Sequence, residues 1–200
     1  MSVAAALAPS RSGFAVQQAD CSVLTAAATP DVHLALWWRS VPNGLDWIAE
    51  LDWDGIEDLD FVSPVADLDD EIAQGLAEAG YPTDGRALVL AREIADLARH
   101  FATIFDLTAV KLRLEVIDTD ACRKFHADTV IARLLTAFFG QGTQWILAAQ
   151  GHDALINQMR TGDVGIFKGR LSVDEPAILH RSPPIAGSGE TRLLLAIDPA

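Results

Sequence analysis

Hydrophobic residues follow a helical period in one long segment of the first half of the chain. Between Arg86 and Phe105 the apolar positions are spaced by four, three, four and three residues, and charged residues occupy the other faces. This spacing places the apolar side chains along one side of a helix with 3.6 residues per turn. The pattern predicts a helix that packs against a sheet, with an apolar stripe formed by Leu90, Ile94, Leu97, Phe101 and Ile104.

The hydrophobic period changes to two from Lys111 onward. Leu112, Leu114 and Val116 alternate with mostly charged residues, which is the pattern of a strand with one buried face. Turns that contain glycine separate further short apolar segments. These features predict an α+β protein whose core is a double-stranded β-helix of the jelly-roll, cupin-like kind. Further strands are expected at residues 125–135, 143–148, 164–167, 177–180 and 191–197.

The remainder of the N-terminal half gives weaker signals. Residues 1–30 show little periodicity, and we expect them to be an irregular segment. Alternation of large apolar residues over 31–41 predicts a strand. Asp67 and Asp70 are expected to cap a helix that runs toward Gly80, because aspartate accepts hydrogen bonds from the free N–H groups of a first helical turn.

An acidic and aromatic segment, residues 46–60, precedes that helix. Its acidic residues do not follow the spacing of a calcium-binding loop, so a solvated face with buried Trp47 and Trp53 is the favoured interpretation. We expect residues 31–200 to form a single domain, in which a helical, aromatic part (31–107) packs on a jelly-roll β core (108–198).

Charge is distributed unevenly along the chain. The formal net charge is −13; residues 1–105 hold 5 basic and 17 acidic residues, whereas residues 106–200 hold 10 and 11. No basic stripe is present, so nucleic acid is not an expected partner. Apolar runs of membrane-spanning length and a basic segment before the alanine-rich N-terminus are also absent from the sequence. A soluble, cytoplasmic protein that does not bind membranes is therefore expected.

Three residues of the second half are candidate metal ligands. His126 and Asp128 are two residues apart, so they would share one face of a strand. His180, from a distant strand, would complete a set of two histidines and one carboxylate that leaves coordination positions open. The alternative is that both histidines are hydrogen-bonded in the core, because a histidine followed by an acid two positions later is a weak signal by itself.

Arg192 is a candidate anion-binding residue. On its strand it would share a face with Leu194 and Ala196 and point into the barrel, where an unpaired charge is unfavourable. It would therefore bind an anionic molecule, or else form an internal salt bridge with Glu190 or Asp163.

The cysteines and the other histidines support weaker alternatives. Cys122 would be the nucleophile of a Cys/His hydrolase with His126, but a buried reduced cysteine is the favoured interpretation. His33 is expected to be structural and His100 to lie on the surface. His152 lies in a turn and would be a substitute ligand only in a metal protein that is not an oxygenase.

The sequence resembles two groups of proteins. Gly162-Asp163, Phe167, His180 and the segment 189–195 look like the C-terminal half of iron(II)/2-oxoglutarate-dependent dioxygenases, and His126-Ala127-Asp128 resembles their upstream metal motif. More closely, residues 122–128, 142–145 and 180–184 look like the bacterial family called domain of unknown function 1826. The first resemblance covers about residues 108–198, and the second extends over most of the chain.

The dioxygenase resemblance implies specific roles. His126, Asp128 and His180 would be ligands of Fe(II), and Arg192 would pair with the distal carboxylate of the cosubstrate 2-oxoglutarate. Thr143 and Gln144 would be cofactor contacts in the cavity, and Thr136 is a further candidate there; the alternative for each is an ordinary strand residue.

Three classes of function follow from these observations. The first is a non-haem iron(II)/2-oxoglutarate-dependent oxygenase that hydroxylates or otherwise oxidises a small molecule or a protein. The second is a non-catalytic, cupin-like metal-binding or sensing protein, and an internal acid beside Arg192 would favour it. The third is a structural or interaction module without a metal. The aromatic N-terminal half would either close over the barrel mouth or form a homodimer interface.

Overall fold

The computed structural model describes residues 10–120 and 122–200, apart from the side chains of residues 10–12, 152 and 153. The described elements are, in chain order, β1 (Ser10–Ser12), β2 (Ala15–Gln18), η1 (Cys21–Ala28), β3 (Leu34–Trp37), η2 (Asp46–Glu50), η3 (Trp53–Gly55), β4 (Leu59–Pro64), α1 (Leu68–Glu78), α2 (Arg86–Phe105), β5 (Ala109–Ile117), β6 (Ala132–Phe139), β7 (Gln144–Leu147), η4 (Ala148–Asp153), β8 (Asn157–Gln158), β9 (Val164–Lys168), β10 (Ile178–Arg181) and β11 (Arg192–Pro199).

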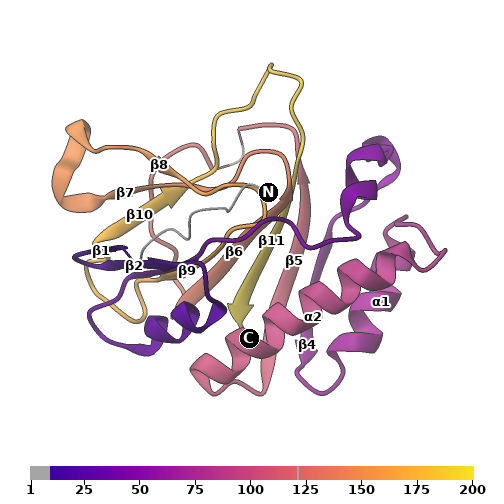
Figure 1. The fold of residues 1–200 in the computed structure, drawn as a ribbon, viewed down its shortest axis with the longest axis horizontal. Coiled ribbons are helices and arrows are strands. Elements are labelled where there is room, and N and C mark those ends of the chain that lie inside the picture. Colours follow the sequence, from indigo (N-terminus) through magenta and orange to yellow (C-terminus); the bar gives the residue numbers. More distant parts are fainter. Residues whose placement is uncertain (1–9, 121) are drawn as a thin grey trace, which may run out of the picture.

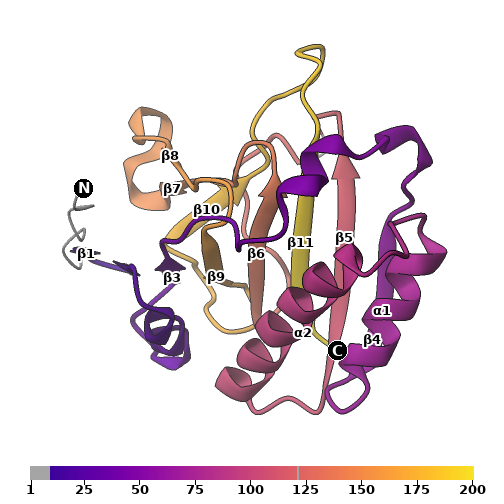
Figure 2. The ribbon, with the colours of Figure 1, turned by 45° about the vertical axis from the view of Figure 1, so that its right-hand side comes forward.

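The described strands form two sheets. The larger has eight strands in the order β1-β2-β3-β9-β6-β11-β5-β4, and the smaller has three in the order β10-β7-β8. Figures 1 and 2 show α1 and α2 on one side of the large sheet, with β7, β8 and β10 at a distance from them. The fold is therefore of the α+β class, with a core of the double-stranded β-helix kind and supporting helices, as the sequence predicted.

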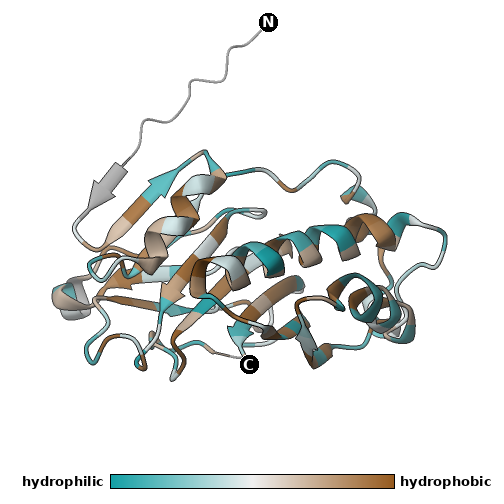
Figure 3. Cartoon of the chain, turned by 90° about the horizontal axis from the view of Figure 1, so that it is seen from below, coloured by the Kyte–Doolittle hydropathy of each residue, from teal (hydrophilic) through white to brown (hydrophobic). Residues whose placement is uncertain are grey.

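Helix α2 forms where the apolar period predicted it. Leu90, Ile94, Leu97 and Phe101 are buried against the large sheet, and Figure 3 shows hydrophilic and hydrophobic residues alternating around this helix. Asp106 ends the helix in the left-handed conformation, with φ of 53°. Aspartate is among the few residues besides glycine that adopt this conformation readily, so the chain can turn here into β5.

The register of β11 with its neighbours decides which residues face the helices and which face the small sheet. Leu193, Leu195 and Ile197 belong to the core under α2, so the residues between them project to the opposite face of the sheet. Arg192 is therefore on the same face as Leu194 and Ala196, as expected. That face carries charged side chains as well, because its residues surround a cavity rather than a closed core.

Several local predictions need correction. Residues 10–28 are not irregular, since they form β1, β2 and η1, and β2 extends the large sheet beside β3. The strand predicted at 125–135 begins only at Ala132, and β4 was not predicted. Helix α1 was predicted, but the Asp67 side chain forms no capping hydrogen bond, and Asp70 lies within the helix.

The interpretation of the acidic segment 46–60 is confirmed for one tryptophan. Trp47 is buried, whereas Trp53 is only half-buried and lies against Phe139, with ring centroids 5.2 Å apart. None of the helices in the described residues is both long enough and apolar enough to cross a membrane.

Candidate metal centre

His126 and His180 are joined directly through their backbones. The N–H of His126 donates to the carbonyl oxygen of His180 at 3.0 Å, and the N–H of His180 donates to that of His126 at 2.9 Å. This pair forms an isolated antiparallel bridge between β10 and the segment before β6. The two imidazole rings consequently lie side by side, with centroids 4.8 Å apart.

Asp128 lies in a loop that the end of β9 holds in place. The backbone N–H of Arg170 donates to the carbonyl oxygen of Asp128 at 2.8 Å, and the N–H of Gly169 donates to that of Ile131 at 3.0 Å. The prediction that His126 and Asp128 share one face of a regular strand is wrong. A backbone bridge and a loop anchored on β9 bring the two residues together instead.

The candidate ligand atoms converge on one point. One ligand atom from each of His126, Asp128 and His180 lies within 4.8 Å of the others. His180 Nε2 is 3.0 Å from Asp128 Oδ2, and His126 Nε2 is 3.6 Å from Asp128 Oδ1. Two ligands bound at a right angle with bonds of about 2.1 Å are about 3.0 Å apart, and the distance from His180 Nε2 to Asp128 Oδ2 matches that spacing.

Hydrogen bonding leaves lone pairs free toward that point. The Nδ1 of His126 lies 2.8 Å from the carbonyl oxygen of Lys124, which can only accept, so Nδ1 carries the proton and Nε2 the lone pair. Asp128 Oδ2 is buried and accepts no well-aligned hydrogen bond from a described residue, despite its short distance to His180. An imidazole nitrogen and a carboxylate oxygen with free lone pairs are the donors that iron(II) accepts.

Electrostatics keep Asp128 and His180 unprotonated near neutral pH. Burial raises the pKa of Asp128, but the close contact with His180 and the charges of His180, Arg133 and His126 outweigh it and lower that pKa to about 2. Burial lowers the pKa of His180, against the opposing effect of Asp128. Both groups are therefore in the form that binds metal ions.

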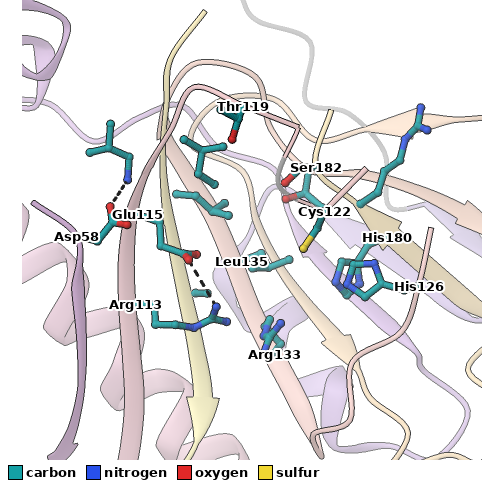
Figure 4. Close-up of a pocket in the computed structure, with 16 residues that line it drawn as sticks. Asp58, Arg113, Glu115, Thr119, Cys122, His126, Arg133, Leu135, His180 and Ser182 are labelled. Atoms are coloured by element: carbon teal, nitrogen blue, oxygen red, sulfur yellow. Dashed lines mark hydrogen bonds and ion pairs between the residues drawn. The ribbon is translucent and has the colours of Figure 1, made fainter. Parts of the chain in front are cut away.

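A cavity of about 240 Å³ opens beside the histidines (Figure 4). Thr143 lines it, as predicted, together with Cys122, Ser182 and several charged residues. Gln144 does not line it; its side-chain oxygen accepts a hydrogen bond from Arg181 Nε at 2.8 Å. Thr136 pairs with Leu195, which faces α2, so it lies on the wrong face of β6 for a cavity contact.

Arg192 is fully buried at the start of β11. Its Nε donates to the carbonyl oxygen of Gln141 at 2.5 Å, and its Nη1 donates to Ser182 Oγ at 3.1 Å, whereas Nη2 has no partner among the described residues. Burial lowers its pKa to about 10, and the charge of Glu115 opposes this. Ser182 lines the cavity and Arg192 does not, so the hydroxyl lies between the guanidinium and the cavity.

The predicted internal acid beside Arg192 is not found in the described part of the chain. Glu190 accepts a hydrogen bond from Gln141 Nε2 at 2.6 Å. Asp163 is buried and accepts from Arg160 and from the backbone N–H of Arg39. Both acids named as alternative partners are thus engaged elsewhere, which leaves a buried cation without a carboxylate within 4.0 Å among the described residues.

The remaining candidates have other environments. Cys122 is exposed at the cavity, not buried as expected. His33 is structural, since its Nδ1 accepts a hydrogen bond from the backbone N–H of Ala177 at 2.9 Å. The side chain of His152 lies outside the described residues.

Two charged residues next to the centre, Arg133 and Asp198, were not predicted from the sequence. Arg133 Nη1 lies 2.6 Å from Asp128 Oδ1, and Arg133 also pairs with Asp198 on β11. The sequence does contain a signal for them, because Arg133 and Asp198 are charged residues within strands that are otherwise mostly apolar. Buried charged residues of this kind require partners.

The fold and this cluster define the class of protein: a double-stranded β-helix protein with a candidate centre of two histidines and one aspartate. The chain matches the family model "Protein of unknown function (DUF1826)" over residues 18–198, and it belongs to that family. No curated protein is significantly similar to it in sequence.

Several solved structures are similar to this chain, and among those named here the rice protein, with a TM-score above 0.5, supports a shared fold. The rice dioxygenase for auxin oxidation is 13% identical, with a TM-score of 0.51 over 83% of this chain and 72% of that one. A Pseudomonas putida prolyl-4-hydroxylase is 12% identical, with a TM-score of 0.47 over 89% of this chain and 97% of that one. The Arabidopsis thaliana dioxygenase for auxin oxidation 1, in complex with 2-oxoglutarate, is 14% identical, with a TM-score of 0.44; 71% of this chain matches 61% of that one.

Proposed function

We propose that this protein is a non-haem iron(II)- and 2-oxoglutarate-dependent oxygenase. The observation that carries the proposal is the convergence of His126, Asp128 and His180 beside a cavity that the two histidines line, with the buried oxygen Asp128 Oδ2 free of any well-aligned donor among the described residues. The likeness of the fold to the rice dioxygenase supports the same class. His126 and His180 would hold the metal through Nε2, and Asp128 through its carboxylate.

The chemistry supplied at such a centre is activation of O2, coupled to conversion of 2-oxoglutarate into succinate and CO2 and to oxidation of a second substrate. The residues of this chain would bind and orient the reactants. The Ser182 hydroxyl and the Arg192 guanidinium behind it would together bind the distal carboxylate of 2-oxoglutarate, since a desolvated guanidinium gains most from an anionic acceptor. Thr143 would be a further polar contact in the cavity.

One observation favours a second candidate, a metal-binding or sensing protein without turnover. Arg192 already donates two hydrogen bonds within the protein, and its guanidinium does not line the cavity. A protein that binds a metal but no 2-oxoglutarate would need no further partner for this side chain.

Turnover of 2-oxoglutarate separates these candidates. The purified protein, supplied with iron(II), ascorbate, 2-oxoglutarate and O2, should form succinate even without its second substrate, because slow uncoupled conversion needs only the centre itself. The His180→Ala variant should form none beyond the level without protein. A wild-type protein that binds iron(II) and leaves 2-oxoglutarate unchanged would support the non-catalytic candidate.

A further inference from the structure

Arg133 links the candidate centre to the C-terminal strand. Its Nη1 lies 2.6 Å from Asp128 Oδ1, its Nε donates to Asp198 Oδ1 at 2.6 Å, and its Nη2 donates to Asp198 Oδ2 at 2.8 Å. One guanidinium therefore contacts two carboxylates, and it is bidentate toward Asp198. Figure 4 shows Arg133 at the cavity, with the two histidines on one side of Arg133 and Arg113 and Glu115 on its other side.

Asp198 fixes the position of this guanidinium. It lies on β11, its side chain is only 7% exposed, and Arg113 Nη2 adds a weaker contact at 3.4 Å. β6 and β11 are neighbouring antiparallel strands, with Leu134 opposite Ile197, so their next residues, Arg133 and Asp198, meet on the cavity face. A two-point contact between planar groups restricts both position and rotation of the guanidinium.

The two oxygens of Asp128 consequently differ. Oδ1 forms an ion pair with Arg133, whose Nη1 lies 2.6 Å away, whereas Oδ2 faces His180 Nε2 at 3.0 Å. A carboxylate fixed through one oxygen presents the other in a defined direction. We propose that Arg133 is a positioning residue, which Asp198 holds in place and which makes Asp128 a one-oxygen metal ligand. This inference rests on the metal centre of the proposed function.

The sign of the effect on metal affinity distinguishes positioning from charge. A cation near the centre repels a divalent metal ion, so loss of Arg133 should strengthen metal binding if charge alone matters. Loss of a residue that orients a ligand weakens metal binding, by about 10- to 100-fold in characterised sites. The two readings therefore predict opposite changes.

Titration of the metal-free protein with cobalt(II) tests the inference. Calorimetry would measure the affinity, and the visible spectrum would report the coordination of the bound ion. Arg133→Met combined with Asp198→Asn removes both charges of the pair and avoids an unpaired buried carboxylate at Asp198. It should bind cobalt(II) at least about 10-fold more weakly than wild type, with an altered spectrum. The lysine of Arg133→Lys cannot contact both carboxylates as a fork, so the cobalt(II) affinity of this variant should lie between those of the wild type and the double variant.

Arg113→Met is the matched control. It removes a cavity arginine that contacts Asp198 but leaves both contacts of Arg133 intact, so cobalt(II) affinity and spectrum should stay at wild-type values. Affinity that is unchanged or increased in the double variant would overturn the positioning role while wild-type binding still supported the metal centre. Absence of cobalt(II) and iron(II) binding in the wild type would overturn both.

Discussion

His126 and His180 exchange two backbone hydrogen bonds, of 3.0 and 2.9 Å, and so form one antiparallel pair. The backbone therefore fixes the distance between the two candidate histidine ligands before any metal binds. Asp128 is held separately, through the carbonyl group that accepts from Arg170. Preformed ligands lose little conformational freedom on metal binding, which favours high affinity.

Removal of one histidine ring should abolish tight metal binding while the fold remains. His126→Ala leaves the backbone bridge intact, because the bridge uses only main-chain atoms, and its side chain is about one-third exposed. We expect iron(II) or cobalt(II) affinity to fall by more than the roughly 10- to 100-fold that loss of a supporting residue costs, because a ligand itself is removed. His100→Ala, on α2, is the matched control and should bind like the wild type. Equal affinities of the two variants would argue against the centre.

Close approach of two backbones at Gly169 should make that position intolerant of a side chain. A Cβ atom there would lie 2.1 Å from the carbonyl oxygen of Val130 and 2.8 Å from that of Asp128. Gly169→Ala should therefore displace the loop that carries Asp128, with lower stability and weaker metal binding. Gly55→Ala is the control, since a Cβ there meets no atom within 4 Å. Thermal unfolding and metal titration of both variants would check this. Wild-type stability and metal affinity in Gly169→Ala would contradict the prediction.

Asp128 should contribute to the stability of the metal-free protein only above acidic pH. Its folded pKa of about 2 is below the ordinary value of 3.8, so the native state favours the ionised form. The contribution, about 2 kcal/mol, is present above about pH 4 and is lost as the pH falls toward 2. Denaturant unfolding at pH 5 and pH 2.5 should show a smaller loss of stability in Asp128→Asn than in wild type. Equal losses would mean that Asp128 is not stabilised in its ionised form.

Arg192 should be needed for 2-oxoglutarate and not for the metal. Its guanidinium lies behind Ser182, away from the candidate ligands, so Arg192→Met should retain iron(II) affinity. The rise in melting temperature that 2-oxoglutarate causes in the iron(II)-loaded wild type should disappear in this variant. Arg86→Met, at an exposed position, should respond like the wild type. A full response in Arg192→Met would transfer the anion-binding role to another residue of the cavity.

The sequence predicted the parts of this protein that depend on local periodicity. The stripe from Leu90 to Ile104 marks α2, and alternation from Leu112 marks β5, because helix and strand each repeat within a few residues. The orientation of Arg192 toward the cavity side also follows from alternation along one strand. These properties require no knowledge of distant contacts.

Features that depend on pairing between distant segments could not be predicted in this way. The bridge between His126 and His180 and the pair of Arg133 with Asp198 depend on which strands become neighbours and in which register. His126 and Asp128 were named as ligands for their two-residue spacing, yet they lie in a loop rather than a regular strand. Gln144, also named from the family resemblance, contacts Arg181 instead of the cavity.

If His126, Asp128 and His180 hold iron(II) in a way that lets 2-oxoglutarate chelate it, the complex should absorb visible light. An anaerobic titration of the protein with iron(II) and then 2-oxoglutarate would measure this absorption. We expect a charge-transfer band that appears only when both are present and that is missing in His126→Ala. Iron(II) binding without the band would contradict the 2-oxoglutarate assignment, and no iron(II) binding would contradict the centre itself.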